Sequence, residues 1–288
     1  MAGYPWISFT TDYGLSDGFV AACHGAIARL APAARVIDVT HLIHPGDVRH
    51  GAAVLSQTVA HLPPAVHLAV VDPGVGTARR PVAVETEGGL LVGPDNGLLP
   101  WAADVLGGVR TAVELTNRDW FAPTVSRTFH GRDIFAPVAA RLAAGDPPAG
   151  AGPQIDPDTL VRLPEPLVTA GDGWVEAEVL TVDRFGNVQL AAPAGALTGL
   201  GPRLRVGDVP AVLGHTFGSA PDGGLVVYAD SADMVAVAVN GGRAAVVLAV
   251  APGDVLRIAT THTATAHAAT ADAASAAGDD DPSGVALP

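Results

Sequence analysis

The hydrophobic rhythm of the chain changes near its middle, and this change constrains the fold more than any other feature. In the first 150 residues, short apolar runs alternate with longer segments of helical periodicity. Residues 66–71 are an unbroken apolar run, as expected for a strand that is covered on both faces. This order predicts an α/β domain with a largely parallel sheet over residues 1–150. Strands are expected at 6–10, 35–40, 66–71, 81–86 and 90–93, and helices at 19–30, 47–62 and 133–144.

The second part of the chain predicts a different architecture. Residues 151–173 are rich in Pro, Gly and Asp and predict a linker. Short strands separated by Gly and Asp turns follow, which predicts a smaller antiparallel β domain, barrel-like or a sandwich, over residues 174–259. Residues 260–288 are mostly Ala, Thr and Asp without aromatic side chains, and predict a disordered tail. The strands are expected at 175–182, 188–191, 225–228, 235–239, 244–250 and 255–258.

Charge and composition exclude several classes of protein. The formal net charge is -13, which argues against a nucleic-acid binder that neutralises phosphates. All 16 basic residues are arginine, which excludes a P-loop lysine and a Schiff-base lysine. Cys23 is the only cysteine, so the chain forms no internal disulfide and no cysteine zinc site, and a small buried thiol is expected. Neither a signal peptide nor a transmembrane run is recognisable, which predicts a cytoplasmic protein without a membrane partner.

Polar residues follow two of the predicted N-terminal strands, where open α/β sheets place ligands. Asp12 and Asp17 come after the first strand; a ribose diol could bind to Asp12, although turn and helix-capping roles are common for Asp. Asp72 ends an apolar strand and precedes a Gly-rich turn that leads to Arg79, so the two side chains could pair across the turn. A plain Asp-Pro turn with surface arginines explains the second pattern equally well.

Two further segments combine polar residues with a turn. His130 precedes a predicted helix and stands beside an Arg and an Asp, which is unusual for a structural histidine. Asp183 and Asn187 bracket a turn that is ordinary for a hairpin, and its functional interpretation is an aromatic and an amide that contact a base. No metal-ligand spacing, nucleophile elbow or dinucleotide fingerprint accompanies these segments, so neither a metal nor another cofactor is expected.

Taken together, the segments TTDYGLSD, VVDPGVGTARRPVAVET, GPDNGLL, TFHGRDIFAPVAARLA, DRFGNV and AVNGG resemble the SAM hydroxide adenosyltransferases, relatives of the 5′-fluorinases and 5′-chlorinases. The resemblance runs from about residue 7 to about residue 258. It implies hydrolysis of S-adenosylmethionine (SAM) to adenosine and methionine. It also implies a homotrimer in which the N-terminal domain of one subunit and the C-terminal domain of the next form each site.

The same resemblance assigns roles to individual residues. Its catalytic group falls on Asp72, Arg79 and His130. Its substrate contacts are the ribose-binding Asp12, the adenine contacts Asn187, Val239 and Gly241, and the methionine contacts Asp17, Asp183 and Ser231.

Departures from the relatives bear on the choice of nucleophile. Halogenating relatives carry a tyrosine at the position of Asp72 and a halide-binding serine at the position of Gly131, so water is the expected nucleophile. Gly46 replaces an aromatic residue that flanks the ribose, and Ala232 replaces an arginine of the fluorinases. The alternatives are a SAM-dependent 5′-halogenase, a non-catalytic SAM or adenosine sensor, and a generic nucleotide-binding oxidoreductase, which the missing glycine fingerprint disfavours.

Overall fold

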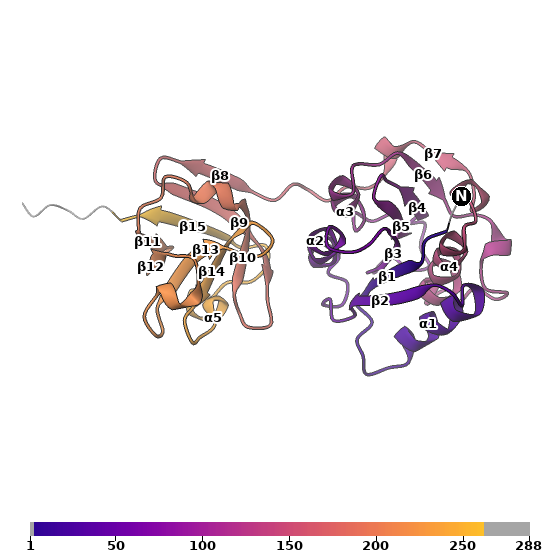
Figure 1. Ribbon diagram of the computed structural model, residues 1–288, viewed down its shortest axis with the longest axis horizontal. Coiled ribbons are helices and arrows are strands. Elements are labelled where there is room, and N and C mark those ends of the chain that lie inside the picture. The colour runs from indigo at the N-terminus through magenta and orange to yellow at the C-terminus, as the bar shows by residue number, and fades with distance from the viewer. Residues whose placement is uncertain (1–2, 262–288) are drawn as a thin grey trace, which may run out of the picture.

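The computed structural model describes residues 3–261, which form a sheet covered by helices followed by a β-barrel (Figure 1). The prediction of a disordered tail therefore falls, beyond Thr261, outside the described residues. The elements of the N-terminal part are β1 (Trp6–Thr11), α1 (Phe19–Leu30), β2 (Arg35–Thr40), α2 (Val48–Val59), β3 (Ala65–Val70), β4 (Pro81–Glu85), β5 (Gly89–Pro94), α3 (Pro100–Val105), β6 (Thr111–Glu114), η1 (Arg118–Trp120), η2 (Gly131–Phe135), α4 (Ala136–Ala144), η3 (Pro148–Gly150), β7 (Gln154–Ile155) and η4 (Pro157–Thr159).

The N-terminal sheet has the strand order β2-β1-β3-β5-β4-β6-β7. The first four strands in this order are parallel, whereas β4, β6 and β7 add antiparallel pairs. β3 is buried along its whole length, as its unbroken apolar sequence predicts. The predicted α/β class with a largely parallel sheet is confirmed.

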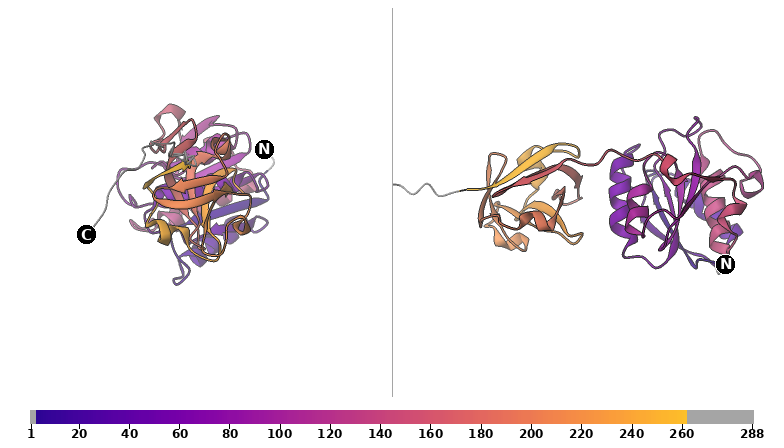
Figure 2. Two further views of the ribbon diagram at one scale, coloured as in Figure 1. Left: turned by 90° about the vertical axis from the view of Figure 1, so that its left-hand side faces the viewer. Right: turned by 90° about the horizontal axis from the view of Figure 1, so that it is seen from above.

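Helices cover both faces of this sheet (Figure 2, right). α1 and α4 pack on one face, where Cys23 and Phe135 join Phe9 of β1 in an apolar core. α2 and α3 pack on the other face, where Leu55 contributes to a second core. Burial raises the pKa of the Cys23 thiol to about 12, so the expected inert buried thiol is confirmed.

The C-terminal part is a closed barrel. Its strand order is β10-β14-β13-β12-β11-β15-β9-β8, and an additional β10–β9 pairing closes the ring and leaves β8 outside it. The interior is lined by Val, Leu, Ile and Ala, among them Val179, Leu190 and Val237. The elements are β8 (Val168–Gly171), β9 (Trp174–Val182), β10 (Val188–Pro193), η5 (Ala194–Leu197), β11 (Arg203–Val206), β12 (Val209–Leu213), η6 (Phe217–Ser219), β13 (Leu225–Ala229), β14 (Met234–Val239), α5 (Ala244–Leu248) and β15 (Val255–Thr260).

One predicted strand is wrong, and the region predicted as a linker contains two short strands. Of the predicted strand 244–250, residues 244–248 form the short helix α5 instead, because only Ala244 is buried there and Val246 is 70% exposed. An apolar run of this length does not distinguish a strand from a helix. Within residues 151–173, β7 pairs with β6 of the N-terminal sheet and β8 pairs with β9 of the barrel.

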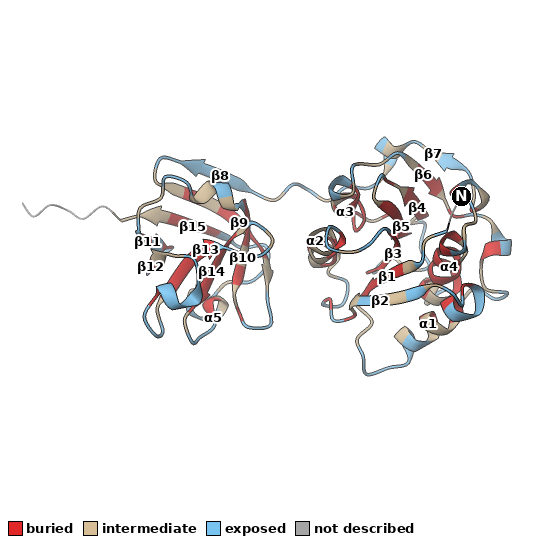
Figure 3. Cartoon of the chain, viewed as in Figure 1, coloured by how far each residue is buried: buried red, intermediate tan, exposed pale blue. Residues whose placement is uncertain are grey.

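α2 is the element of the N-terminal domain that faces the barrel (Figures 1 and 3). Arg49 forms an ion pair with Glu178 of β9 at 2.8 Å, and Gln57 donates a hydrogen bond to Gln189 of β10 at 2.8 Å. A small apolar cluster around Ala53 lies in the same contact. Within residues 3–261, no helix combines the length and the apolar character that a membrane crossing requires.

Candidate active site

Asp72 and Arg79 form a buried ion pair at the end of β3. The strand places Asp72 at its carboxyl end, and the following turn brings the guanidinium of Arg79 back onto it. Arg79 Nε donates to both carboxylate oxygens at 3.0 Å, and Nη2 contacts Oδ2 as well. The side chains are only 6% and 10% exposed, so this bidentate pair is shielded from water. The turn requires glycine, because Gly76 has φ +75° and an added Cβ would lie 2.4 Å from the Arg127 carbonyl oxygen.

His130 joins this pair from a different element. Arg79 Nη2 lies 2.8 Å from His130 Nδ1. Because a guanidinium can only donate, Nδ1 is the acceptor, and a neutral His130 carries its proton on Nε2. Burial, followed by the neighbouring Arg79 charge, lowers the pKa of His130 below its ordinary 6.5, although Asp72 and Asp133 act in the opposite direction. The imidazole is therefore neutral at pH 7 and presents an N–H at its other end.

A π-helical turn positions His130. The turn spans Gly131–Phe135 and leads into α4. Pro137 has no N–H for the carbonyl of Asp133, and that carbonyl accepts a hydrogen bond from Ala122 N–H at 2.8 Å instead. The turn also buries the ring of Phe135, over which the Arg79 guanidinium lies at 5.1 Å. The turn before α4 thus holds the imidazole of His130 and packs against the guanidinium of Arg79.

Asp12 lies directly after β1, the strand beside β3. Its Oδ2 accepts a hydrogen bond from Gly46 N–H at 2.8 Å. Gly46 has φ +75°, which explains a glycine at this position of the loop. Asp17 lies in the same loop but is exposed, and α1 is capped by Gly18 without a side-chain bond, so the capping interpretation of Asp17 is wrong.

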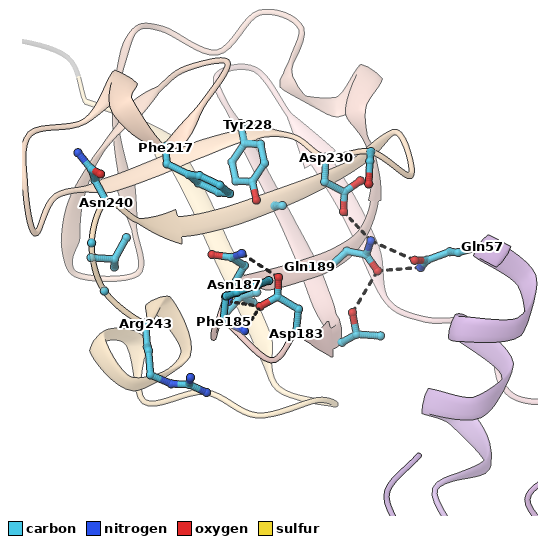
Figure 4. A pocket seen from close by; sticks show the side chains of 17 residues that line it. Gln57, Asp183, Phe185, Asn187, Gln189, Phe217, Tyr228, Asp230, Asn240 and Arg243 are labelled. Atoms are coloured by element: carbon cyan, nitrogen blue, oxygen red, sulfur yellow. Dashed lines mark hydrogen bonds between the residues drawn. The ribbon is translucent and has the colours of Figure 1, made fainter. Parts of the chain in front are cut away.

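A large hollow lies on the barrel. It encloses about 880 Å³, and Figure 4 shows side chains of the barrel around it together with Gln57 of α2. Five residues that the sequence assigns to substrate line this hollow: Asp183, Asn187, Ser231, Val239 and Gly241.

Hydrogen bonds organise the floor of this hollow (Figure 4). Asn187 Nδ2 donates to Asp183 Oδ2 at 2.8 Å, and the other oxygen of Asp183 accepts backbone N–H bonds from Phe185 and Asn187. Asp183 therefore shapes the turn that presents Asn187. The sequence did not single out Phe217 and Tyr228, which line the hollow with ring centroids 5.6 Å apart. Neither residue has a local signal, because Tyr228 lies in the continuous apolar run of β13 and Phe217 in the short turn η6.

The two groups of candidate residues occupy different places in one chain. Asp12, Asp17, Asp72, Arg79 and His130 belong to the N-terminal domain, and none of them lines the hollow on the barrel. Arg79 contacts both Asp72 and His130, and these are the three residues that the resemblance assigns to catalysis. A single subunit thus offers a charged cluster and a separate hollow lined by aromatic and amide groups.

Comparison with known families gives this arrangement a context. The model of the SAM hydroxide adenosyltransferase N-terminal domain matches residues 7–152, and that of the C-terminal domain matches residues 177–257. The chain belongs to the SAM hydroxide adenosyltransferase family. A member from Salinispora arenicola named (R)-S-adenosyl-L-methionine hydrolase is 68% identical over 258 residues, which cover 90% of this chain and 99% of that protein.

More distant SAM hydroxide adenosyltransferase relatives differ in their names. A hydrolase of the same name from Thermus thermophilus is 43% identical and covers 88% of this chain and 98% of its own length. A fluorinase from Actinopolyspora mzabensis is 28% identical over 82% of this chain and 91% of its own. The solved structure of an uncharacterized conserved protein from Thermotoga maritima has a TM-score of 0.82 and 38% identity, covering 88% of this chain and 99% of that one. The sequence similarity is therefore higher to the hydrolases than to the fluorinases.

Proposed function

We propose that this protein hydrolyses S-adenosylmethionine at the ribose C5′ to adenosine and methionine, with the (R)-sulfonium epimer as its substrate. The contact of Asp72, Arg79 and His130 carries the proposal, because it joins an anion, a cation and a neutral imidazole at one partly buried point. The 68% identity to a protein named (R)-S-adenosyl-L-methionine hydrolase supports the substrate and the epimer. No metal or organic cofactor is part of this mechanism.

Each residue of the cluster has a distinct task. Water approaches C5′ opposite the sulfonium, so the positive charge on sulfur disappears as methionine leaves as a neutral thioether. His130 donates its Nε2–H to the water and holds its position, and Arg79 fixes the imidazole through Nδ1. Asp72 accepts a hydrogen bond from the water and turns a lone pair of the oxygen toward C5′. Shielding from bulk water strengthens all three interactions.

The proton balance needs no strong base. As the C–O bond forms, the C–S bond breaks and its electron pair stays on sulfur. The water oxygen becomes a protonated alcohol, which is a strong acid and releases its proton to the carboxylate of Asp72 and from there to solvent. The overall reaction converts the SAM cation and water into adenosine, methionine and one proton. The reaction thus requires the carboxylate of Asp72 beside the water, but it does not require Asp72 to be a stronger base than an ordinary carboxylate.

In this proposal, each substrate site is built from residues of the N-terminal domain of one subunit and of the barrel of another. One oxygen of Asp12 is occupied by Gly46 N–H, and the other is available to the ribose diol. The hollow on the barrel receives the adenine at Asn187, Val239 and Gly241, and Ser231 lies at the methionine end. A homotrimer that sets the barrel of one subunit against the N-terminal domain of the next brings these groups together.

Product analysis tests the activity directly. Incubating the purified protein with each SAM epimer in ¹⁸O-labelled water should give adenosine whose 5′-hydroxyl carries the label, with (R)-SAM consumed faster. Chromatography with mass detection separates adenosine from 5′-chloro-5′-deoxyadenosine when chloride is added. A chlorinated product would make the protein a 5′-halogenase, and tight SAM binding without turnover would make it a sensor; either result overturns the proposal.

The protonation state of His130 predicts the pH dependence. A protonated imidazole cannot accept from Arg79 and would place two cations side by side, so the neutral form is the active one. Since burial and Arg79 lower the pKa of His130 below 6.5, kcat/KM should be constant from neutral pH upward and fall as the pH decreases through a value under 6.5. A kcat/KM profile between pH 4.5 and 8.5 measures this limb. An inflection above pH 7 would contradict the assignment.

Mixed oligomers test the site between subunits. His130→Ala removes the cluster and Asn187→Ala weakens the hollow, so each variant alone should be nearly inactive. In a coexpressed 1:1 mixture, about a quarter of all intersubunit sites combine two wild-type halves, and about a quarter of the wild-type rate should return. The purified mixture is assayed beside each parent variant at equal concentration. Sites formed within one chain would give no recovery.

A further inference from the structure

A cluster of two histidines and an aspartate lies at the edge of the N-terminal sheet, outside the residues used by the proposed mechanism. His24 belongs to α1, Asp38 to the edge strand β2, and His41 to the segment directly after β2. One ligand atom from each side chain lies within 4.8 Å of the other two. Three separate positions of the chain thus converge on one point.

His41 is the unusual member of this cluster. It is only 4% exposed, and its Nε2 lies 3.0 Å from Asp38 Oδ1. The contact lacks hydrogen-bond geometry, so among residues 3–261 this buried nitrogen has no hydrogen-bond partner. A buried polar atom without a partner calls for an explanation. With Nδ1 donating its proton to Thr11 Oγ1, Nε2 carries a lone pair toward the Asp38 oxygen, and the two atoms can bind one cation between them.

The distances and ligand types fit a transition metal. His24 Nε2 lies 2.8 Å from the same oxygen of Asp38. Zinc holds imidazole nitrogen and carboxylate oxygen at about 2.0–2.2 Å, so neighbouring ligand atoms around it are about 3.3 Å apart. Small rotations of His24 and Asp38, which are 34% and 44% exposed in their side chains, cover the difference. Imidazole ligands favour zinc and its neighbours over magnesium or calcium.

The surroundings of His41 also match those of a metal ligand. Its Nδ1 lies 2.9 Å from Thr11 Oγ1, which fixes the ring through its second nitrogen, as is usual for metal-binding histidines. The ring of Phe9 packs edge-on against His41 with centroids 4.8 Å apart and lies 5.8 Å from the ring of His24. The cluster is therefore oriented from one side and walled by an apolar ring on another.

From these observations we infer that His24, Asp38 and His41 bind one divalent transition-metal cation, with zinc as the ion that the ligand set fits. Two neutral imidazoles and one carboxylate leave a net negative charge for the cation, and water fills the remaining position. The site connects α1 to the edge strand β2. It also reaches the loop of Asp12, because Gly14 N–H donates to the His41 carbonyl oxygen at 2.7 Å. The proposal does not depend on the hydrolase activity.

Zinc titration of the full-length, tag-free protein tests the site. The protein is first treated with a chelator and desalted, and calorimetry then follows the binding of zinc alone. The wild type should bind one equivalent, and His24→Gln or Asp38→Asn should weaken this binding at least tenfold. One equivalent of zinc should also raise the melting temperature of the wild type but not of these variants. The matched control is His61→Gln, which changes an exposed histidine after α2 and should bind zinc as the wild type does.

Two outcomes overturn the inference. If the wild type binds no zinc, the cluster is only a carboxylate placed between two imidazoles. If His24→Gln and Asp38→Asn bind zinc as tightly as the wild type, the cation is held elsewhere. Because Asp38→Asn preserves shape, and circular dichroism with thermal unfolding confirms its fold, loss of binding in this variant reports the ligand itself. Neither result bears on SAM hydrolysis, which is measured separately.

Discussion

Replacing His130 with alanine is expected to lower kcat for SAM hydrolysis by about 10²-fold, with a much smaller change in KM, because the attacking water is no longer held in place. The water loses its Nε2–H donor, and Arg79 Nη2 loses the acceptor that it contacts at 2.8 Å. In the proposed site, Asp12 and the hollow on the barrel bind most of the substrate, and this substitution changes neither of them. Steady-state kinetics with (R)-SAM separates the two parameters, and thermal unfolding shows whether the variant is folded.

Asp72→Asn should have an effect of similar size, because the buried guanidinium of Arg79 then lacks its anion. Since the three side chains form one unit, the double variant should be little slower than either single variant. His61→Ala, in an exposed turn, is the matched control and should keep the wild-type rate. Full activity of either His130→Ala or Asp72→Asn would remove that residue from the catalytic cluster.

The candidate site residues that belong to short sequence motifs could be predicted from the sequence. Asp72, Arg79 and His130 were identified by resemblance, whereas the residues alone allowed a turn and surface arginines as well. The direction of the Arg79–His130 bond, and with it the tautomer, depends on contacts 51 positions apart in the chain. The cluster of His24, Asp38 and His41 has no recognisable metal-ligand spacing, because the fold brings His24 of α1 to β2 and the segment directly after it.

The fold was predictable where periodicity is long and regular. α1 spans the predicted residues 19–30, and the buried β3 could be identified from its apolar run. Local sequence does not predict α3, which has six residues, or the short strands β6, β11 and β12, whose four or five residues include polar or proline positions. Such short elements are stabilised by tertiary pairing, so their local sequence carries little signal.

Introducing the serine of the halogenating relatives at Gly131 is expected to lower kcat/KM at least tenfold and to destabilise the protein by about 1–3 kcal/mol, as overpacking does. A Cβ at Gly131 would lie 1.9 Å from the hydroxyl oxygen of Tyr13 and 3.0 Å from its Cζ. The Tyr13 ring cannot easily move aside, because Phe19 and Phe129 pack edge-on against it with centroids 6.3 and 5.7 Å away.

Burial raises the pKa of Tyr13, and the nearby Cys23, Asp12 and Asp72 raise it further, so the Tyr13 hydroxyl lies near the candidate cluster. Removing its hydroxyl removes the 1.9 Å contact but leaves the 3.0 Å contact with Cζ, so Tyr13→Phe/Gly131→Ser should regain part of the stability and rate that Gly131→Ser loses. Gly195→Ser is the matched control, since a Cβ there meets no atom within 4 Å. Kinetics and thermal unfolding of the wild type, Tyr13→Phe, Gly131→Ser and the double variant give the coupling between the two positions. Equal losses with and without the Tyr13 hydroxyl would disprove the predicted clash between position 131 and Tyr13.

In added chloride, the double variant should still form adenosine, because the carboxylate of Asp72 repels a halide but accepts a hydrogen bond from water.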